Sequence, residues 1–579
     1  MANPFQYSAL GPGEIRLVQI KRRNNELQPL RCRIIHTTLS RCRALDSFFL
    51  YKALSYVWGG PRREIVLCGD AAVNSDFDDI DTSTSISANL LSALKTISLQ
   101  PLENDQPFHM YWIDALCINQ NDVTERAYQV RLMKEIYSTA KEVVIWLGGR
   151  ELENSIQFMR AGPEIVVSLA NNKETVLARR DLWLQGLVPL LTQPWFRRIW
   201  VIQEVAVSRE IKIICGDLEV RWSEFINVAS WVHSRQVNPP RLREFCDSVR
   251  MIEGLRHVYQ KRKDPKFRCN SCKTNDFARG LAEPKELLDL IIATQHYESS
   301  DERDKIYALL GIASYLEQDS VSRKVEVDYR ISPEQVLVNV GQLYIKGFRP
   351  LRIFDSLENS ISSGTDRPSW IPLWNAPRDH RCLSQLCPTS YHLRQDYRAI
   401  VRQESSQHHI KLGGKLIDNV AYVLRDFSKL MSSDRNMIVP PIILNEWNNS
   451  VGCTINECFD PMADPVSKLL KLAQPERMYR GGVTGSTIAD ISTLQRELCD
   501  QRVVIVTKRG YIGIAPQLVE AGDRVALFAG SPLPFVLSKR KGEAEESCWI
   551  LKGQCFIRGD DLNYLMENRK MKLAMIRLG

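Results

Sequence analysis

The stretch PWFRRIWVIQE, residues 194–204, places a carboxylate among aromatic side chains. Phe196, Trp200 and Glu204 have the i, i+4, i+8 spacing that brings side chains to one helical face, and Pro194 suits the start of that helix. A carboxylate that shares a face with an indole can lie in an apolar pocket, where burial raises its pKa. Such a group can serve acid–base catalysis or stabilise a developing positive charge.

A structural role for these residues is the alternative. Trp and Glu four residues apart also occur on ordinary helices, and Glu204 can pair with Arg197, Arg198 or a more distant arginine. We expect Trp195 and Phe196 to pack in the core. The local pattern alone leaves both interpretations open.

A second cluster follows a predicted strand in YKALSYVWGG, residues 51–60. The strand runs through Ser55 and ends in the aromatic pair Tyr56 and Trp58, followed by two glycines. The first of them, Gly59, lets the backbone turn tightly or approach a ligand closely.

A third cluster lies in WIDALCINQND, residues 112–122. Asp122 can cap the following helix. Asn119 and Gln120 are not needed for this cap, so their polar side chains are left for another role. Asp114 lies within an apolar run, where a buried carboxylate needs a partner. That partner is either a structural hydrogen bond or a catalytic arrangement.

The surrounding pattern predicts an α/β domain over residues 1–217. Short β-rich runs fill residues 14–68, and buried strands are predicted at 108–118, 142–149 and 211–216. Helical spacing appears over 85–97 and after Asp122, and two further helices are expected at about 151–170 and 179–192. Strands that alternate with helices favour an open, parallel sheet, in which ligands bind at the carboxyl ends of the strands.

Two further regions are predicted. Residues 218–345 have mainly helical spacing and include the basic segment 256–279, which is predicted to be a solvated loop, with an anionic partner as the alternative. Residues 346–579 are predicted to be mixed α+β, with a β-rich last third typical of a small barrel or sandwich.

Composition and absent motifs restrict the function. The net charge of +8 on 579 residues is too small and dispersed to indicate a nucleic-acid partner. The sequence lacks a phosphate-binding GxxxxGK[ST] loop, a GxGxxG fingerprint, a GxSxG elbow and an HExxH site. Cys269 and Cys272 form a lone CxxC without the second ligand pair of a zinc site, so no metal is expected.

No segment has the character of a signal peptide or of a membrane span of about 18–20 apolar residues. Fifteen cysteines without a regular framework are then expected to be reduced. We therefore predict a cytoplasmic protein without a membrane partner.

Three long blocks resemble the fungal heterokaryon incompatibility (HET) domain: YKALSYVWGG, YWIDALCINQNDVTERAYQVRLMKEIYSTAKEVVIWLG and PWFRRIWVIQEVAVSREI. They occur in the family's order and cover about residues 50–215. The resemblance implies non-self recognition that leads to fungal cell death. DERDKIYALLGIA, RPSWIPLW and GIAPQLVEAGDRVALFAGSPLPFVL resemble segments that follow the domain in such proteins, without a chemistry that can be transferred.

The HET domain is in turn similar, more weakly, to TIR domains. ALSYVW lies where TIR domains have their first strand, and WVIQE fits the WxxxE spacing around the glutamate of NAD-cleaving TIR enzymes. This resemblance implies a TIR/flavodoxin-like sheet, NAD as a substrate with no bound cofactor, and Glu204 as the catalytic carboxylate. The residues predicted to bind substrate are Ser55, Tyr56, Trp58, Gly59, Asp114, Asn119, Gln120 and Trp200.

A carboxylate beside the ribose would stabilise the oxocarbenium-like state through which the nicotinamide–ribose bond breaks. The alternative is a non-catalytic signalling module that acts through self-association of the HET domain. The activating signal and the protein partner are not indicated by the residues.

Overall fold

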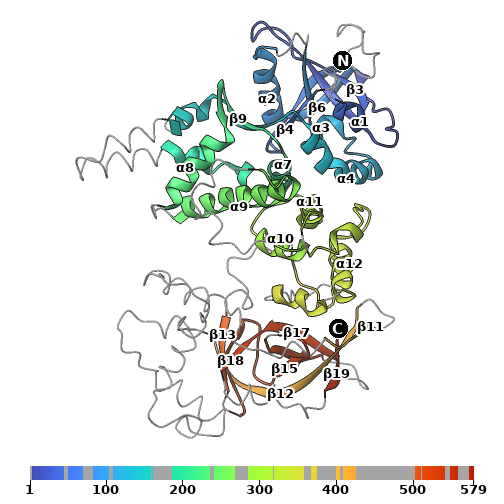
Figure 1. The fold of residues 1–579 in the computed structure, drawn as a ribbon, viewed down its shortest axis with the longest axis vertical. Helices are drawn as coiled ribbons and strands as arrows, with labels where there is room; N and C mark the ends of the chain where they lie inside the picture. Colours follow the sequence, from blue (N-terminus) through green and yellow to red (C-terminus); the bar gives the residue numbers. More distant parts are fainter. Residues whose placement is uncertain are drawn as a thin grey trace, which may run out of the picture. The chain divides into compact units, whose positions relative to one another are not determined.

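The fold is taken from a computed structural model of the chain (Figure 1). The structure describes residues 3–44, 50–68, 82–102, 108–157, 159–160, 186–234, 240–267, 284–316, 318–347, 349–357, 367–374, 399–403, 408–425, 502–509, 511–531, 533–540, 548–558 and 573–579. Cys269 and Cys272 lie outside these residues, as does most of the two helices predicted between 151 and 192.

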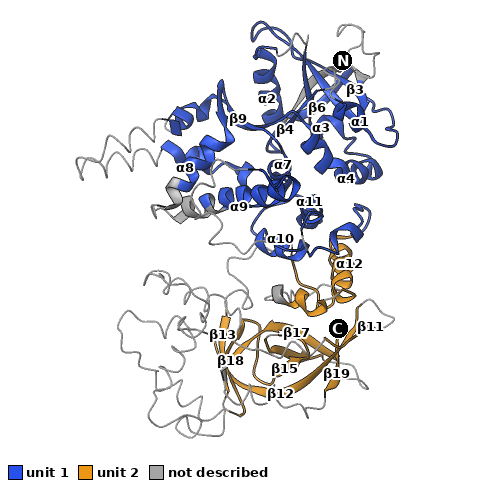
Figure 2. Cartoon of the chain, in the orientation of Figure 1, with its two compact units in different colours: residues 1–331 blue, residues 332–579 orange. Residues whose placement is uncertain are grey.

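The chain divides into two compact units, residues 1–331 and 332–579 (Figure 2). The helices that follow residue 217 therefore belong to the same unit as the N-terminal sheet as far as residue 331. The division at 217 and 345 into three regions stays a prediction.

In the described part of unit 1, ten strands form one sheet in the order β1-β6-β5-β3-β2-β7-β4-β8-β9-β10. Their bounds are β1 (Asn3–Pro4), β2 (Glu14–Lys21), β3 (Arg31–Thr38), β4 (Lys52–Ser55), β5 (Arg62–Cys68), β6 (Thr82–Ser87), β7 (Phe108–Trp112), β8 (Glu142–Gly148), β9 (Ile211–Cys215) and β10 (Leu218–Arg221).

The sheet is mixed, so the prediction of a parallel sheet is wrong for its outer part. Neighbours are parallel along β7-β4-β8-β9, where helical crossovers connect the strands. Antiparallel pairs flank them, because β2 pairs with β3 and β9 with β10 after short connections. The pair β2–β7, which joins the two parts, is also antiparallel.

Strand β4 lies at the point where the chain reverses direction across the sheet. The chain goes from β4 to β7 on one side and then to β8 on the other. These two crossovers place α2 (Ala88–Leu99) and α4 (Val123–Thr139) on either side of the parallel strands (Figure 1). Side chains at the carboxyl ends of β4 and β7 therefore meet at one edge, where open α/β sheets bind ligands.

Helix starts follow their caps. The Ser87 hydroxyl accepts from the Leu90 amide, so α2 begins three residues later than predicted, after β6 ends. Asp122 caps α4 as predicted, accepting from the Thr124 amide at 2.9 Å and the Glu125 amide at 3.0 Å. In the described part of this unit the remaining helices are α1 (Leu39–Arg43), α3 (Asp114–Cys117), α7 (Trp200–Ala206), α8 (Trp222–Ser234), α9 (Pro240–Lys263), α10 (Leu287–Ala293) and α11 (Asp304–Ala313), with 3-10 turns η2 (Arg150–Leu152), η3 (Pro194–Arg197) and η5 (Ser322–Lys324).

Three local predictions are wrong. The strand predicted over 108–118 ends at Trp112, because Asp114 starts the short helix α3. Residues 256–263 of the basic segment belong to helix α9, whose last turn carries three basic residues that suit a helix C-terminus. Residues 268–279 of that segment lie outside the described residues.

The third wrong prediction is the continuous helix from Pro194 to Glu204. Residues 194–197 form the 3-10 turn η3, Arg198 is extended with ψ 132°, and α7 begins only at Trp200. Arg198 forms a bridge with Glu298, so a distant segment interrupts the helix. Phe196 therefore does not share a helical face with Glu204.

Unit 2 contains α12 (Pro333–Ile345), the 3-10 turn η6 (Pro350–Ser356) and a β-sheet whose long strand is β12 (Ile410–Leu424). Strands β15, β16, β17, β19 and β12 pair in that order, and β12 pairs with β15 again, which closes a ring. The predicted small barrel is therefore confirmed. The other strands are β11 (Val401–Gln403), β13 (Arg502–Thr507), β14 (Ile512–Pro516), β15 (Arg524–Phe528), β16 (Phe535–Lys539), β17 (Cys548–Gln554), β18 (Phe556–Arg558) and β19 (Ala574–Leu578).

Among the described residues, none of the helices combines the length and apolar character that crossing a lipid bilayer requires.

Candidate functional site

Ser55 connects the end of β4 to the segment that carries Glu204. Its hydroxyl donates to the Glu204 carboxylate, and the Trp195 indole Nε1 donates to the Ser55 oxygen at 2.7 Å. Ser55 is 1% exposed and Trp195 is fully buried. The β4 end, the η3 turn and α7 thus meet in one polar contact inside an apolar core.

Glu204 is a buried carboxyl group whose charge is only partly compensated. Glu204 is 1% exposed, and this burial raises the pKa of its carboxyl group to about 7. Arg198 and the hydrogen bond from Ser55 act in the opposite direction and lower the pKa. Asp114 raises it further. The carboxyl group is therefore partly protonated near neutral pH and can hold or release a proton there.

Arg198 is the cation of the site. Its guanidinium donates to the Tyr56 carbonyl oxygen and lies close enough to both Glu204 and Asp114 to lower their pKa values. Arg197 instead forms an ion pair with Glu298 at the surface, at 3.6 Å. Of the two arginines considered as partners of Glu204, only Arg198 acts on it.

Asp114 and Trp58 form the more open side of the site. Trp58 Nε1 donates to Asp114 Oδ2 at 2.8 Å, and the Ala115 amide donates to Oδ1 at 2.7 Å. Burial raises the pKa of Asp114, while Arg198, Trp58 and the Tyr56 hydroxyl lower it. Trp58 is 44% exposed, so this residue is partly open to solvent beside the carboxylate.

Gly59 follows Trp58 with φ 110°, in the left-handed region that favours glycine, and a Cβ there would meet nothing within 4 Å. This positive φ uses the conformational freedom expected of Gly59, and its predicted contact with a ligand stays a prediction.

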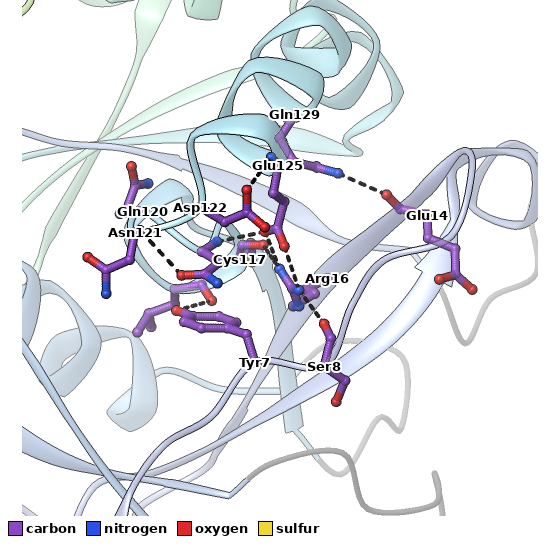
Figure 3. A network of polar contacts seen from close by, with 12 residues as sticks. Tyr7, Ser8, Glu14, Arg16, Cys117, Gln120, Asn121, Asp122, Glu125 and Gln129 are labelled. Atoms are coloured by element: carbon purple, nitrogen blue, oxygen red, sulfur yellow. Dashed lines mark hydrogen bonds and ion pairs between the residues drawn. The ribbon is translucent and has the colours of Figure 1, made fainter. Parts of the chain in front are cut away.

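The loop before α4 is built by structural hydrogen bonds (Figure 3). Gln120 Nε2 donates to the Asp114 carbonyl oxygen at 3.0 Å, and Asn119 Oδ1 accepts from the Asn121 amide at 3.3 Å. The Asn119 amide donates to Glu125 at 2.7 Å. Asn119 and Gln120 thus shape the loop that carries Asp114, and their predicted role in substrate binding stays a prediction.

Arg16 of β2 is the center of this network and was not indicated by the local sequence pattern. It is fully buried and donates to Glu125 at 2.6 and 3.0 Å, to the Cys117 carbonyl at 3.0 Å and to the Ser8 carbonyl at 2.6 Å (Figure 3). Since the Arg16 position lies 109 residues from Glu125, only the tertiary fold brings the two together.

The two tryptophans of residues 194–204 make different polar contacts: Trp195 is fully buried, as predicted, and the predicted role of Trp200 in substrate binding stays a prediction. Trp200 Nε1 donates to Asp304 Oδ2 of α11 at 3.0 Å, while Trp195, expected only as a core residue, contacts Ser55 beside Glu204. Phe196 is buried as predicted. The aromatic residue in direct polar contact with the Ser55 hydroxyl is therefore Trp195.

The described residues contain no group of three or more His, Cys, Asp or Glu side chains arranged to hold a metal ion. The expectation that the chemistry needs neither metal nor cofactor, with NAD as substrate, stays a prediction.

Comparisons with known proteins match two parts of the chain. The family model "Heterokaryon incompatibility protein (HET)" matches residues 51–204, and the "Het-6 beta-barrel domain" matches residues 489–568. The chain is similar to Heterokaryon incompatibility protein 6, OR allele, of Neurospora crassa, with 22% identity over 88% of this chain and 89% of the relative. No solved structure matches the chain. The first model covers Ser55, Asp114 and Glu204, so the candidate site lies within the matched domain.

Proposed function

Because the chain is a HET-domain protein, we propose that it acts in fungal heterokaryon incompatibility and triggers cell death on non-self recognition. The support is the HET match across the candidate site, together with a relative named for incompatibility whose similarity extends over most of the chain.

The finer proposal is a TIR/flavodoxin-like domain that cleaves NAD. The parallel strands β7-β4-β8-β9 have the spatial order 2-1-3-4 when numbered along the chain, as in flavodoxin-like sheets. The observation that carries the proposal is Glu204, a buried carboxyl with a pKa of about 7 beside the carboxyl end of β4.

Each group has a definite task in this reaction. The exposed Trp58 indole offers a stacking surface for a ring, and the Asp114 carboxylate beside it can accept ribose hydroxyls. Ionised Glu204 stabilises the oxocarbenium-like state as nicotinamide leaves and water then attacks the ribose carbon. Since Glu204 is 1% exposed, the reaction requires the Ser55–Glu204 contact to open toward the substrate.

The test is nicotinamide release from NAD by the full chain, in wild type and in Glu204→Gln. The amide keeps a hydrogen-bond acceptor for Ser55 but cannot carry the negative charge, so we expect the rate to fall at least about 100-fold. Glu135→Gln is the matched control, because Glu135 is a 41% exposed carboxylate of α4 paired with Arg43. Full activity of Glu204→Gln, with an unchanged thermal unfolding midpoint, contradicts the chemistry.

A second candidate function has its own observation. Glu204 is closed off from solvent and joins α7 to β4 through Ser55, which also fits a structural group in a non-catalytic module that signals by self-association. Cell killing separates the two. If Glu204→Gln, expressed at wild-type level, kills cells as wild type does, assembly is the mechanism and NAD cleavage is not.

A further inference from the structure

The segment that carries Trp195, Arg198 and Glu204 is attached to a part of the chain about 100 residues later. The Glu298 amide donates to the Arg197 carbonyl at 2.5 Å, and the Ile199 amide donates to the Glu298 carbonyl at 2.9 Å. This pairing holds Arg198 extended between η3 and α7. The direction in which α7 leaves the turn thus depends on residue 298.

Asp304 contacts the first residue of α7. It accepts from Trp200 Nε1 at 3.0 Å and from the Tyr329 hydroxyl at 2.6 Å. The Arg126 guanidinium of α4 lies 3.8 Å from the center of the Tyr329 ring. Burial raises the pKa of Asp304 to about 6, so the carboxyl is mostly ionised at pH 7 and accepts both hydrogen bonds.

Gly311 allows α11 to approach α7 closely. A Cβ at this position would lie 2.1 Å from Gln203 Oε1 and 2.9 Å from Lys134 Cβ. Gln203 is 2% exposed and precedes Glu204 directly, so its side chain has little room to move. Helix α11 therefore meets α7 at Trp200 and again at Gln203.

Carbonyl groups at the C-terminal end of α7 also accept hydrogen bonds from helix α9. Gln260 of α9 donates to the Ala206 carbonyl at 2.9 Å and to the Ser208 carbonyl at 3.0 Å. Helix α7 has only seven residues, too few to be stable alone, and it depends on these tertiary contacts.

We propose that Asp304, Tyr329 and Gly311 are positioning residues that hold α7 so that the Glu204 carboxyl meets Ser55. All three lie beyond residue 204, where the family match ends, and beyond the predicted boundary at 217. The candidate site is therefore completed by helix α11 and by Tyr329. The placement of Glu204 does not require NAD cleavage, and only its catalytic consequence rests on the proposed function.

The experiment uses full-chain variants and two measurements that do not need activity. Hydrogen–deuterium exchange reports the protection of amides 199–206. The infrared difference spectrum between each variant and the same variant with Glu204→Gln reports the pH at which the Glu204 carboxyl titrates.

For Asp304→Ala we expect amides 199–206 to exchange at least about tenfold faster and the Glu204 titration to move from about 7 toward its ordinary value of about 4.3, because water reaches the carboxyl. Asp304→Asn should restore both the slow amide exchange and the Glu204 titration near 7, since the amide oxygen of the new side chain can accept from Trp200 and its NH₂ can donate to the Tyr329 oxygen. A loss of stability alone would lower the melting temperature without moving the Glu204 titration.

Arg330→Ala is the matched control, because Arg330 is 74% exposed on its side chain and pairs only with Asp328 next to the same segment. Unchanged exchange and titration in Asp304→Ala overturn the proposal. If Asp304→Ala does not fold, Tyr329→Phe and Gly311→Ala decide in the same way. Nicotinamide release is scored separately: if wild type releases none while the titration shifts as expected, the proposed reaction fails and the positioning role stands.

Discussion

Two carboxylates of unit 1, the partly buried Glu125 and the buried Glu204, have different partners for their charge. Glu125 receives two hydrogen bonds from the fully buried Arg16 and one from the Asn119 amide. The Glu204 carboxylate accepts one hydrogen bond from the Ser55 hydroxyl, while the nearby Arg198 donates to the Tyr56 carbonyl oxygen. Removing one partner of an ion pair such as that of Arg16 with Glu125 leaves the other charge without compensation and is strongly destabilising. An incompletely compensated carboxyl keeps its proton near neutral pH, which is a property of catalytic groups.

Removing the cation of the paired site should have the largest effect on stability. Arg16→Ala leaves the partly buried Glu125 without its cation and should cost about 3–5 kcal/mol of unfolding free energy, measured by denaturant titration. Arg43→Ala, which breaks the exposed pair of Arg43 with Glu135, a carboxylate on the same helix α4 as Glu125, should cost at most about 1 kcal/mol. Equal losses from the two variants would show that burial does not separate these ion pairs.

The incompletely compensated charge of Glu204 should make the stability of the chain depend on pH. The pKa of Glu204 is raised to about 7 in the folded chain from about 4.3 in the unfolded chain. The contribution of protonated Glu204 to the free energy of unfolding is therefore fully present below pH 4 and is lost as the pH rises through 7. Between pH 5 and 8 the free energy of unfolding of the wild type should therefore fall by about 2–3 kcal/mol relative to that of Glu204→Gln. A constant stability difference between the two over this range contradicts the raised pKa.

A pair of helical glycines tests how tightly α7 is held. Gly311→Ala should destabilise the chain by about 1–3 kcal/mol, because the new Cβ meets Gln203. Gly254→Ala in α9 has nothing within 4 Å of its new Cβ and should stabilise by up to about 1 kcal/mol through helix propensity. Thermal unfolding of both variants measures the sign, and a stabilising Gly311→Ala would mean that α11 and α7 are not in close contact.

Local chemistry made part of this architecture predictable. The Asp122 cap, the apolar strand β8 and the positive φ of Gly59 depend on residues close together in the sequence, and the structure has them as expected, whereas β7 ends at Trp112, short of the predicted residue 118. The closed ring of unit 2 combines strands of the β-rich last third, for which a barrel or sandwich was predicted, with β12 from before it. In these cases the deciding interactions lie within one element or between neighbours.

The composition of the site could not be predicted in the same way. The 194–204 segment has the periodicity of one helix, yet its pairing with Glu298 breaks it at Arg198. That break separates Trp195, which contacts Ser55, from Trp200, which contacts Asp304, and helical spacing indicated neither contact. Arg16 and Asp304 act over 109 and 104 residues of chain, a separation at which no local pattern connects two side chains.

The pH profile of nicotinamide release from NAD by the full chain tests the role of Glu204 most directly. We expect kcat/KM to rise as Glu204 ionises through pH 7, and this rise to be absent in Glu204→Gln, whose rate should be at least about 100-fold lower. No release by wild type at any pH between 5 and 9, or an identical profile in Glu204→Gln, would contradict catalysis by this carboxyl.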